Sequence, residues 1–455
     1  MPAAPKILGV ASATDLDFRY GCTPAWWQIW KGLYEVGVDL IVTPYRGRAV
    51  ESPWWRTAPN PLYREAELFA GARGLAARLR GDTLLRREED HPEDTVGDKL
   101  TREAIWRYVT PRWQRHLERI LERERNVAAV IVFTVPMAHF RGIPTRLRER
   151  FDVPVVFYDG DVPMSLPEFG GMDTGFNYYH GADPSEYDLV LSNSDGGLER
   201  LRELGARQAE AVFWAADPEL FQPAPVEKEY DVFFYGYGDK FRREWMKALV
   251  GEPSRSDPEI DFALGGKDFR GDIGNARLIG DIPFNVFAQA ISRARINLNI
   301  TRRPHATVYG SSTCRPFELA ASGSAIVSNP QEGIERWFDP ESEIRVVSSA
   351  DEALAAYREL LDDPPAAEAM GRRARERVLD EHTYAHRARQ ILELVGVSVS
   401  AAKPPVRVSG PVEGVWGGAE RPSAQRTGGG GLGEPGGSPS SYREVPPVGQ
   451  GGARG

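Results

Sequence analysis

Cysteine is scarce in this sequence, with only Cys22 and Cys314 among 455 residues. Two cysteines that lie far apart in the chain cannot build a disulfide framework or the closely spaced ligand set of a zinc site. Their scarcity favours a reducing, cytoplasmic compartment. It also gives no reason to expect a bound metal ion.

Long hydrophobic runs are absent as well. The first apolar run, Ile7–Ala11, is too short for the core of a signal peptide or for a membrane span, and it fits a buried strand better. No later run reaches the roughly 20 apolar residues that a membrane-spanning helix needs. We therefore expect no membrane span, while peripheral contact with a membrane stays open.

The sequence has no excess of positive charge. Its 56 Lys and Arg are outnumbered by 65 Asp and Glu, which gives a net charge of -9. A general nucleic-acid binder needs a cationic surface that displaces counterions from phosphates, so we expect no nucleic-acid partner. The basic cluster 372–375 is followed closely by acids and reads as a solvated helix face.

Short apolar runs alternate with helical patterns through the first half of the chain, as in an α/β protein. A helical pattern at Trp26–Val36 and a long, charged one from Pro61 to Leu121 separate some of these runs. Continuous apolar strands between helices indicate a parallel sheet covered on both faces. The expected strands are Ile7–Ala11, Val38–Thr43, Val127–Phe133, Val153–Tyr158 and Leu189–Ser192.

The same pattern restarts after a proline-rich connector. The last two helical patterns are Pro365–Leu379 and Tyr384–Val395. The expected strands of this half are Asp231–Tyr235, Asp261–Leu264, Arg277–Ile279, Ile296–Ile300 and Ala325–Ser328. The organisation is therefore two doubly wound, Rossmann-like domains facing a central cleft. Their expected bounds are 1–215 and 227–397, joined by the connector 216–226.

The composition changes again near residue 398. Gly, Pro and Ser dominate from there to the end, including four consecutive glycines at 428–431. Such a segment cannot bury enough apolar surface to offset its ordering entropy. We expect 398–455 to be a disordered tail, and the sequence gives no function for it.

The most informative segment lies between Asn299 and Asn329. A strand is followed by a polar loop and then by a helix that begins near Pro316, a residue suited to a first helical turn. A helix amino terminus with nearby hydroxyls and a guanidinium can bind a diphosphate, and a carboxylate one turn later can hold a ribose. The residues concerned are Gly310, Ser311, Ser312, Thr313, Arg315 and Glu318. An ordinary helix cap with a first-turn acid explains the same residues.

The run CRPFELAASGSAIVSN at 314–329 resembles the donor-site helix of GT-B glycosyltransferases of the family-4 kind. It is more closely similar to the CgeB-like (spore-maturation) glycosyltransferase domain. The resemblance extends to WAADPELFQP at 214–223 and EHTYAHRARQIL at 381–392, so it covers most of Val212 to Val395.

This resemblance implies a GT-B fold and a hexosyltransferase-like activity (EC 2.4) with a nucleotide-sugar donor. It implies that Glu318 holds the nucleotide ribose, that Ser311–Arg315 face the diphosphate, and that the anomeric configuration is retained. The broader family often has a second glutamate eight positions before the first, where this chain has Gly310. That difference leaves the sugar and the details of the mechanism open.

A second candidate phosphate loop follows the expected strand Asp231–Tyr235. Gly236 and Gly238 would allow close approach of the backbone to a phosphate, and Lys240, Arg242 or Arg243 could neutralise it. A tight turn with solvated basic residues fits the same pattern.

Four residues of the N-terminal half are candidates for proton transfer. Asp159 and Asp161 follow an expected strand, so one of them could act as general base toward an acceptor hydroxyl or bind the transferred sugar. His139 and His180 are looser candidates, because histidine suits proton transfer near neutral pH. Structural roles, such as an acidic turn or a buried histidine, are the alternatives. The early tryptophans, Trp26 among them, are read mainly as core, with stacking on an acceptor as the alternative.

Three functions follow from these residues. The first is metal-independent transfer of a sugar from a nucleotide diphosphate to an unknown acceptor, whether small molecule, polysaccharide or protein, without a further cofactor. In the second, Asp159-Gly160-Asp161 is the DxD metal motif of a GT-A transferase. In the third, the chain is a non-catalytic, degenerate transferase that binds a sugar, a nucleotide or a protein.

Overall fold

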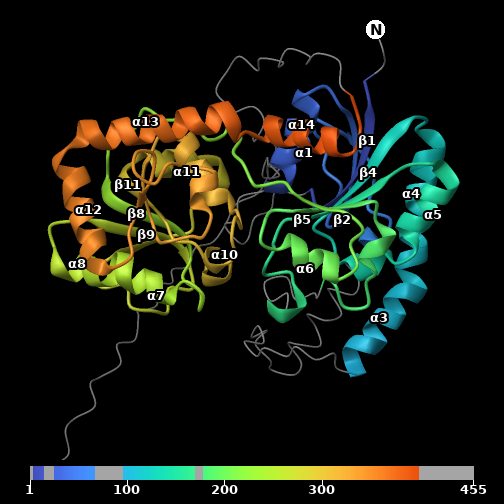
Figure 1. The fold of residues 1–455 in the computed structure, drawn as a ribbon, viewed down its shortest axis with the longest axis horizontal. Helices are drawn as coiled ribbons and strands as arrows, with labels where there is room; N and C mark the ends of the chain where they lie inside the picture. The colour runs from blue at the N-terminus through green and yellow to red at the C-terminus, as the bar shows by residue number, and fades with distance from the viewer. Residues whose placement is uncertain (1–3, 15–24, 67–95, 170–177, 399–455) are drawn as a thin grey trace, which may run out of the picture. The chain divides into compact units, whose positions relative to one another are not determined.

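The computed structural model describes residues 4–14, 25–66, 96–169 and 178–398 (Figure 1). The predicted tail lies outside the described residues from position 399 onward. Part of the predicted helical stretch from Pro61 to Leu121 also lies outside them, between 67 and 95.

Seven parallel strands form the first sheet within the described residues, in the order β3-β2-β1-β4-β5-β6-β7. The apolar run Val127–Phe133 is strand β4 in full, and it lies beside β1 in the middle of the sheet. The strands are β1 (Lys6–Ala13), β2 (Asp39–Arg46), β3 (Arg56–Thr57), β4 (Val127–Phe133), β5 (Val155–Asp159), β6 (Leu189–Ser192) and β7 (Ala209–Ala211). All five strands expected here are confirmed.

Helices cover this first sheet, whose strands and helices we call the N-lobe. In α4, the residues Trp113, Leu117 and Leu121 are buried at a spacing of four, which gives the helix one apolar face toward the sheet. The helices are α1 (Ala25–Glu35), α3 (Val96–Tyr108), α4 (Thr110–Arg123), α5 (Ile143–Phe151) and α6 (Leu198–Glu203).

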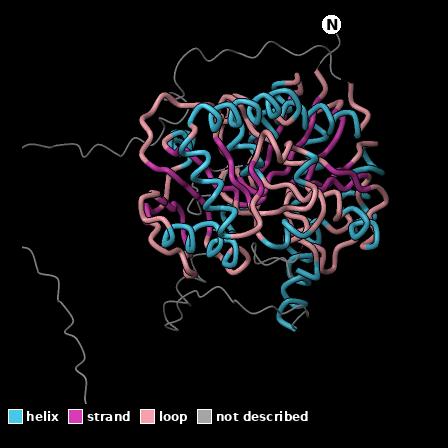
Figure 2. The backbone as a smooth tube through the Cα atoms, turned by 60° about the vertical axis from the view of Figure 1, so that its left-hand side comes forward, coloured by secondary structure: helices cyan, strands magenta, loops and turns pink. Residues whose placement is uncertain are grey.

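The second sheet repeats the strand order of the first. In the part of the chain that is described, it has six parallel strands in the order β10-β9-β8-β11-β12-β13. We call this sheet and its helices the C-lobe. The strands are β8 (Tyr230–Tyr237), β9 (Phe262–Lys267), β10 (Arg277–Gly280), β11 (Ala294–Asn299), β12 (Ala325–Ser328) and β13 (Arg345–Val346). The five expected strands are again confirmed. Figure 2 shows the strands in the interior and the helices outside them.

Each sheet has a hydrophobic core of its own. One buried cluster surrounds β1, β4 and β5, and a separate one surrounds β8, β9 and β11. The C-lobe helices are α7 (Arg243–Met246), α8 (Glu252–Ser256), α9 (Phe287–Ser292), α10 (Arg303–Thr307), α11 (Cys314–Ala321), α12 (Ala350–Asp362) and α13 (Pro364–Glu381).

The last helix, α14 (Tyr384–Leu394), returns to the N-lobe and packs against α1 (Figure 1). The contact is close at Gly32 of α1, where a Cβ atom would lie 2.5 Å from the carbonyl oxygen of Tyr384. The buried Arg387 of α14 donates to the carbonyl of Phe213 in the connecting segment. The chain thus crosses between the lobes twice, before β8 and before α14.

Candidate functional site

A cavity of about 580 Å³ lies between the two lobes. It is lined by the carboxyl ends of β1, β2, β4 and β5, by those of β8 and β11, and by the start of α11. In both sheets the strand order reverses at this point, between β1 and β4 and between β8 and β11. Ligands of open parallel sheets bind at such switch points. The volume is within the usual range of about 300–1,000 Å³ for small-molecule sites.

The amino terminus of α11 opens into this cavity. Thr313 is the N-cap residue, and its side chain makes no capping hydrogen bond to the helix. Thr313, Cys314 and Arg315 all line the cavity. The first amide groups of a helix carry partial positive charge and lack partners within the helix. This end of α11 is therefore suited to an anionic ligand.

Glu318 and Arg315 form a pair beside the helix start. Glu318 is fully buried, and its Oε2 accepts a hydrogen bond of 2.9 Å from Nη1 of Arg315. The Arg315 guanidinium also lies over the ring of Phe287, 4.4 Å from its centre. These contacts hold one positive and one negative group at the cavity wall. Both residues line the cavity.

The hydroxyls of Ser311 and Ser312 form hydrogen bonds between the lobes. The Ser311 hydroxyl donates to the carbonyl of Val162 at 2.8 Å, and the Ser312 hydroxyl donates to the carbonyl of Asn193 at 2.8 Å. Both side chains are fully buried, and only Ser312 is part of the cavity wall. These hydroxyls therefore fix the loop before α11 from the N-lobe side.

Gly310 lies at the same contact rather than on the cavity wall. Its φ is +57°, a conformation that L-residues rarely adopt, and a Cβ atom would lie 2.9 Å from Oδ2 of Asp195. A glutamate at position 310 would be strained and would meet a carboxylate. The backbone at position 310 therefore suits glycine and disfavours an acidic side chain.

Of the three basic residues that the sequence offered in the loop after β8, Arg242 is the one that lines the cavity. Gly236, Tyr237 and Arg242 line the cavity, whereas Lys240 and Arg243 do not. Gly238 packs against the loop after β9, where a Cβ atom would lie 2.8 Å from Cα of Phe269.

Asp239 holds two of the cavity's cationic side chains. Its carboxylate accepts from Nη1 of Arg242 at 3.3 Å and from Nε of Arg302 at 2.9 Å. Arg302 follows β11 and also lines the cavity. No motif in the sequence marks Arg302, which lies in the polar loop after β11.

Asp159 and Asp161 have different environments although they are two residues apart. The Asp159 carboxylate is fully buried and accepts hydrogen bonds of 2.6 Å from the hydroxyls of Ser165 and Tyr179. Burial raises the pKa of Asp159 despite these bonds. Asp161, in contrast, lines the cavity, and its side chain is about a quarter exposed at 28%. Of the two, Asp161 is the one that faces the cavity.

The two predicted histidines are not on the cavity wall. His139 is buried in a short helix, η1 (Met137–Phe140), and its Nδ1 is hydrogen-bonded to the hydroxyl of Tyr45. Burial lowers the pKa of His139 to about 4. Tyr45 itself lines the cavity, so His139 is connected to the cavity wall through that tyrosine. His180 lies outside the cavity lining, although its neighbour Tyr178 is part of it.

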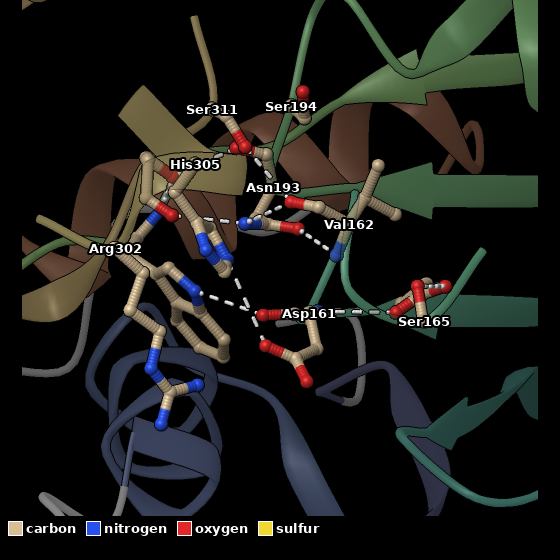
Figure 3. A network of polar contacts seen from close by, with 12 residues as sticks. Asp161, Val162, Ser165, Asn193, Ser194, Arg302, His305 and Ser311 are labelled. Carbon is tan, nitrogen blue, oxygen red and sulfur yellow. Dashed lines mark hydrogen bonds and ion pairs between the residues drawn. The ribbon is translucent and has the colours of Figure 1, made fainter. Parts of the chain in front are cut away.

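A third histidine, His305, does face the cavity, and the sequence analysis missed it. It belongs to α10 and is 4% exposed, with Nε2 3.7 Å from Oδ1 of Asp161 (Figure 3). Burial, with Arg302 and Arg242 adding to it, lowers the pKa of His305 to about 3. The imidazole is therefore neutral near pH 7. Its only sequence signal was a rare residue type in the polar loop after β11.

The early tryptophans divide between core and cavity. Trp27 and Trp30 are buried, and Trp27 stacks on Trp54 with ring centres 5.2 Å apart. Trp26 lines the cavity together with Tyr45 and Tyr178. The N-lobe wall of the cavity is thus partly aromatic.

Across the described residues, no group of three or more His, Cys, Asp or Glu side chains is arranged to hold a metal ion. Within the same residues, no helix combines the length and the apolar character that crossing a bilayer requires.

Comparison with known proteins gives a family match for one part of the chain. Residues 242–393, which include α11, match the family model described as "Glycosyl transferase-like". No curated protein matches the chain in sequence.

Solved structures with a similar fold cover most of the chain. Sucrose-phosphate synthase from Thermosynechococcus elongatus is 15% identical, covers 86% of this chain and 98% of its own, and has a TM-score of 0.58. Anabaena HepE in complex with UDP and glucose is 11% identical, with 86% and 99% covered and a TM-score of 0.51. The β-glucosyltransferase of T4 phage is also 11% identical, with 86% and 100% covered and a TM-score of 0.51. The chain therefore has the GT-B fold of glycosyltransferases, and its residues 242–393 match the glycosyl transferase-like family.

Proposed function

We propose that the cavity binds a nucleotide-diphosphate sugar and that the protein transfers the sugar to an acceptor. The observation that carries this proposal is the position of α11. Its amino terminus, with Arg315 and Glu318, opens into a cavity formed by the carboxyl ends of two parallel sheets. The same residues carry the resemblance to the donor site of GT-B transferases.

Two parts of the donor, the diphosphate and the ribose, have matching groups on the C-lobe side. The diphosphate would contact the first amides of α11 and the Arg315 guanidinium, with Arg242 and Arg302 adding positive charge. The Glu318 carboxylate would accept hydrogen bonds from the two ribose hydroxyls. UDP is the first nucleotide to test, because the similar HepE structure holds UDP and glucose. A hexose is the expected sugar.

In the proposed reaction, the acceptor oxygen bonds to the anomeric carbon of the sugar. The bond from that carbon to the diphosphate breaks, and its electron pair leaves with the diphosphate. Arg315 and the positive end of α11 stabilise the charge of the leaving group, which is the role that a metal ion has in other transferases. Asp161, on the opposite wall, takes the proton of the acceptor hydroxyl. A direct displacement of this kind inverts the anomeric configuration, unlike the retention that the family resemblance implies.

The proposal is tested with the purified protein and a panel of UDP, GDP, TDP and ADP sugars. A ligand that binds only the folded state raises the melting temperature by mass action. We expect one nucleotide of the panel to raise it, and the matching nucleotide sugar to be hydrolysed slowly or transferred. If no member of the panel shifts the melting temperature, the donor-site assignment is wrong.

A non-catalytic module remains the second candidate, and Gly310 is the observation that favours it. The backbone there excludes the acid that the broader family often uses at the sugar end of the donor site. Nucleotide-sugar binding without hydrolysis or transfer would support this function over catalysis.

The GT-A alternative is excluded by the fold, because the chain has the two sheets of GT-B proteins. The geometry of the DxD segment agrees. A DxD metal site needs both carboxylates, and that of Asp159 is buried against Ser165 and Tyr179.

A further inference from the structure

The two lobes are joined at one edge of the cavity by paired backbone segments. Residues 193–196 follow β6 of the N-lobe, and residues 309–312 precede α11 of the C-lobe. The amide of Gly196 donates to the carbonyl of Tyr309 at 2.9 Å, and the amide of Ser312 donates to the carbonyl of Asn193 at 2.9 Å. Ser194 and Ser311 form an antiparallel bridge between these bonds. We call these two segments the interlobe clasp.

The side chain of Asn193 lies at the centre of the clasp (Figure 3). It is fully buried, and its Nδ2 donates to the carbonyl of Val162 at 3.1 Å and to that of Ser312 at 2.9 Å. Its Oδ1 accepts from the amide of Val162 at 2.9 Å. Both amide hydrogens and the carbonyl oxygen are therefore used, and one of these bonds crosses between the lobes.

These bonds connect two segments that carry cavity groups. Val162 immediately follows Asp161, and Ser312 immediately precedes Thr313, the N-cap of α11. Asn193 itself does not line the cavity. It can influence a ligand only through the two segments that it joins.

One measurable distance across the cleft depends on this connection. The Asp161 carboxylate comes from the N-lobe, and the His305 imidazole comes from α10 of the C-lobe. Nε2 of His305 lies 3.7 Å from Oδ1 of Asp161, and the dashed line in Figure 3 marks this pair. If the clasp opened, the two side chains would separate and water would reach His305.

We propose that Asn193 is a positioning residue that fixes Asp161 relative to the start of α11 and to His305. Its effect on sugar transfer rests on the proposed function above, whereas its effect on the geometry of the cleft does not. Loss of its side chain leaves the carbonyls of Val162 and Ser312 without these donors inside the fold. The acceptor side and the donor side of the cavity then lose their fixed relative position.

The test uses Asn193→Ala and Asn193→Asp, which keeps the shape but loses the two donors. Ser311→Ala, which removes only the hydroxyl bonded to Val162, is the milder variant should both fail to fold. Asn297→Ala is the matched control, because Asn297 is also a buried asparagine but bonds to Ile291 within the C-lobe.

The first readout is the NMR titration of His305, which needs no activity. Asp161, Arg302 and Arg242 are the charged groups that face this imidazole. In the unchanged protein its pKa is about 3 because it is buried. In the Asn193 variants we expect this pKa to move toward the value of about 6.5 of a hydrated histidine, and Asn297→Ala should leave it in place.

The second readout separates turnover from nucleotide affinity. We expect kcat to fall by about 10- to 100-fold, because small misplacements of reacting groups have effects of that size. Nucleotide affinity should change by less than about threefold, because the groups proposed to hold the donor all lie in the C-lobe.

Folded Asn193 and Ser311 variants with the original titration of His305 would overturn the proposal, and so would a matching shift in Asn297→Ala. The unchanged protein could bind no nucleotide sugar while the pKa of His305 shifts as expected in the Asn193 variants. The proposed function would then be wrong, and the positioning role of Asn193 would be supported.

Discussion

The two lobes share one strand order but present different side chains to the cavity. Among the described residues, the C-lobe contributes Arg242, Arg302 and Arg315 to the lining, whereas the N-lobe contributes one arginine, Arg46, and the acid Asp161. The N-lobe wall also carries Trp26, Tyr45 and Tyr178. The shared strand order therefore sets where a ligand binds. The side chains at the strand ends determine which ligand each lobe can hold.

The largest expected effect concerns the N-lobe wall. Asp161→Asn should lower the rate of sugar transfer by about 10²- to 10⁴-fold, the usual contribution of a general base. Nucleotide affinity should stay within about threefold, because the donor contacts lie in the C-lobe. Steady-state kinetics and calorimetry measure the two quantities. Asp183→Asn, at a cap of a short surface helix, is the control. If Asp161→Asn weakened nucleotide binding by as large a factor as it lowers the rate, the proposed division of donor and acceptor contacts between the lobes would be wrong.

The next effect concerns the C-lobe wall. Arg315→Ala should weaken nucleoside diphosphate binding by about 10- to 100-fold, because it removes a charge-assisted contact to phosphate. Arg295→Ala is the matched control, since Arg295 pairs with Asp231 away from the cavity. Calorimetric titration with the nucleoside diphosphate measures the affinity of both variants. Similar affinities for the two would show that Arg315 serves only to neutralise Glu318.

The third effect is on the free energy of unfolding, and it is tested with one buried histidine from each lobe, His139 and His305. Burial holds the pKa of His139 at about 4 and that of His305 at about 3, below the value of about 6.5 expected in the unfolded chain. At a pH between these folded-state pKa values and 6.5, the unfolded state binds more protons than the folded state. The free energy of unfolding therefore decreases as the pH falls below 6.5. Each histidine should account for a loss of about 1–2 kcal/mol between pH 6.5 and 5.

Urea unfolding at several pH values measures this loss. His139→Gln and His305→Gln should each flatten the dependence of stability on pH, one in the N-lobe and one in the C-lobe. Variants whose pH dependence matches that of the unchanged protein would show that these imidazoles are not held neutral by burial.

The smallest effect concerns the aromatic part of the N-lobe wall. Trp26→Ala should raise the KM for the acceptor by about 3- to 10-fold, the value of a single stacking contact, and leave the KM for the donor unchanged. Trp54→Ala is the control, because Trp54 stacks on Trp27 and does not line the cavity. A change in the KM for the donor alone would show that Trp26 contacts the donor and not the acceptor.

The strands were predictable because burial on both faces leaves a continuous apolar run. Val127–Phe133, Leu189–Ser192 and Ala325–Ser328 have in the structure the bounds that the sequence indicated. The edge strands β3, β7 and β13 were missed. They have two or three residues each, too few for a hydrophobic pattern to show.

The candidate site was predictable at the level of segments and not of side chains. The sequence placed Glu318 and Arg315 on a helix that follows a strand and a loop, and the structure has them on α11 at the cavity, because this strand, loop and helix pattern is local. It could not separate Asp161 from Asp159, or Arg242 from Arg243, since which of two nearby residues faces a cavity depends on the packing of the whole lobe. His305 and Asn193 act through contacts with distant segments, and no local pattern marks them.

The central claim is that the start of α11 holds a nucleoside diphosphate, and Glu318 is its most direct probe. The measurement is a calorimetric titration of the nucleotide that stabilises the protein most into the unchanged protein and into Glu318→Ala. The loss of two hydroxyl contacts to a carboxylate predicts at least about 100-fold weaker binding. Equal affinities for the two proteins would contradict the account.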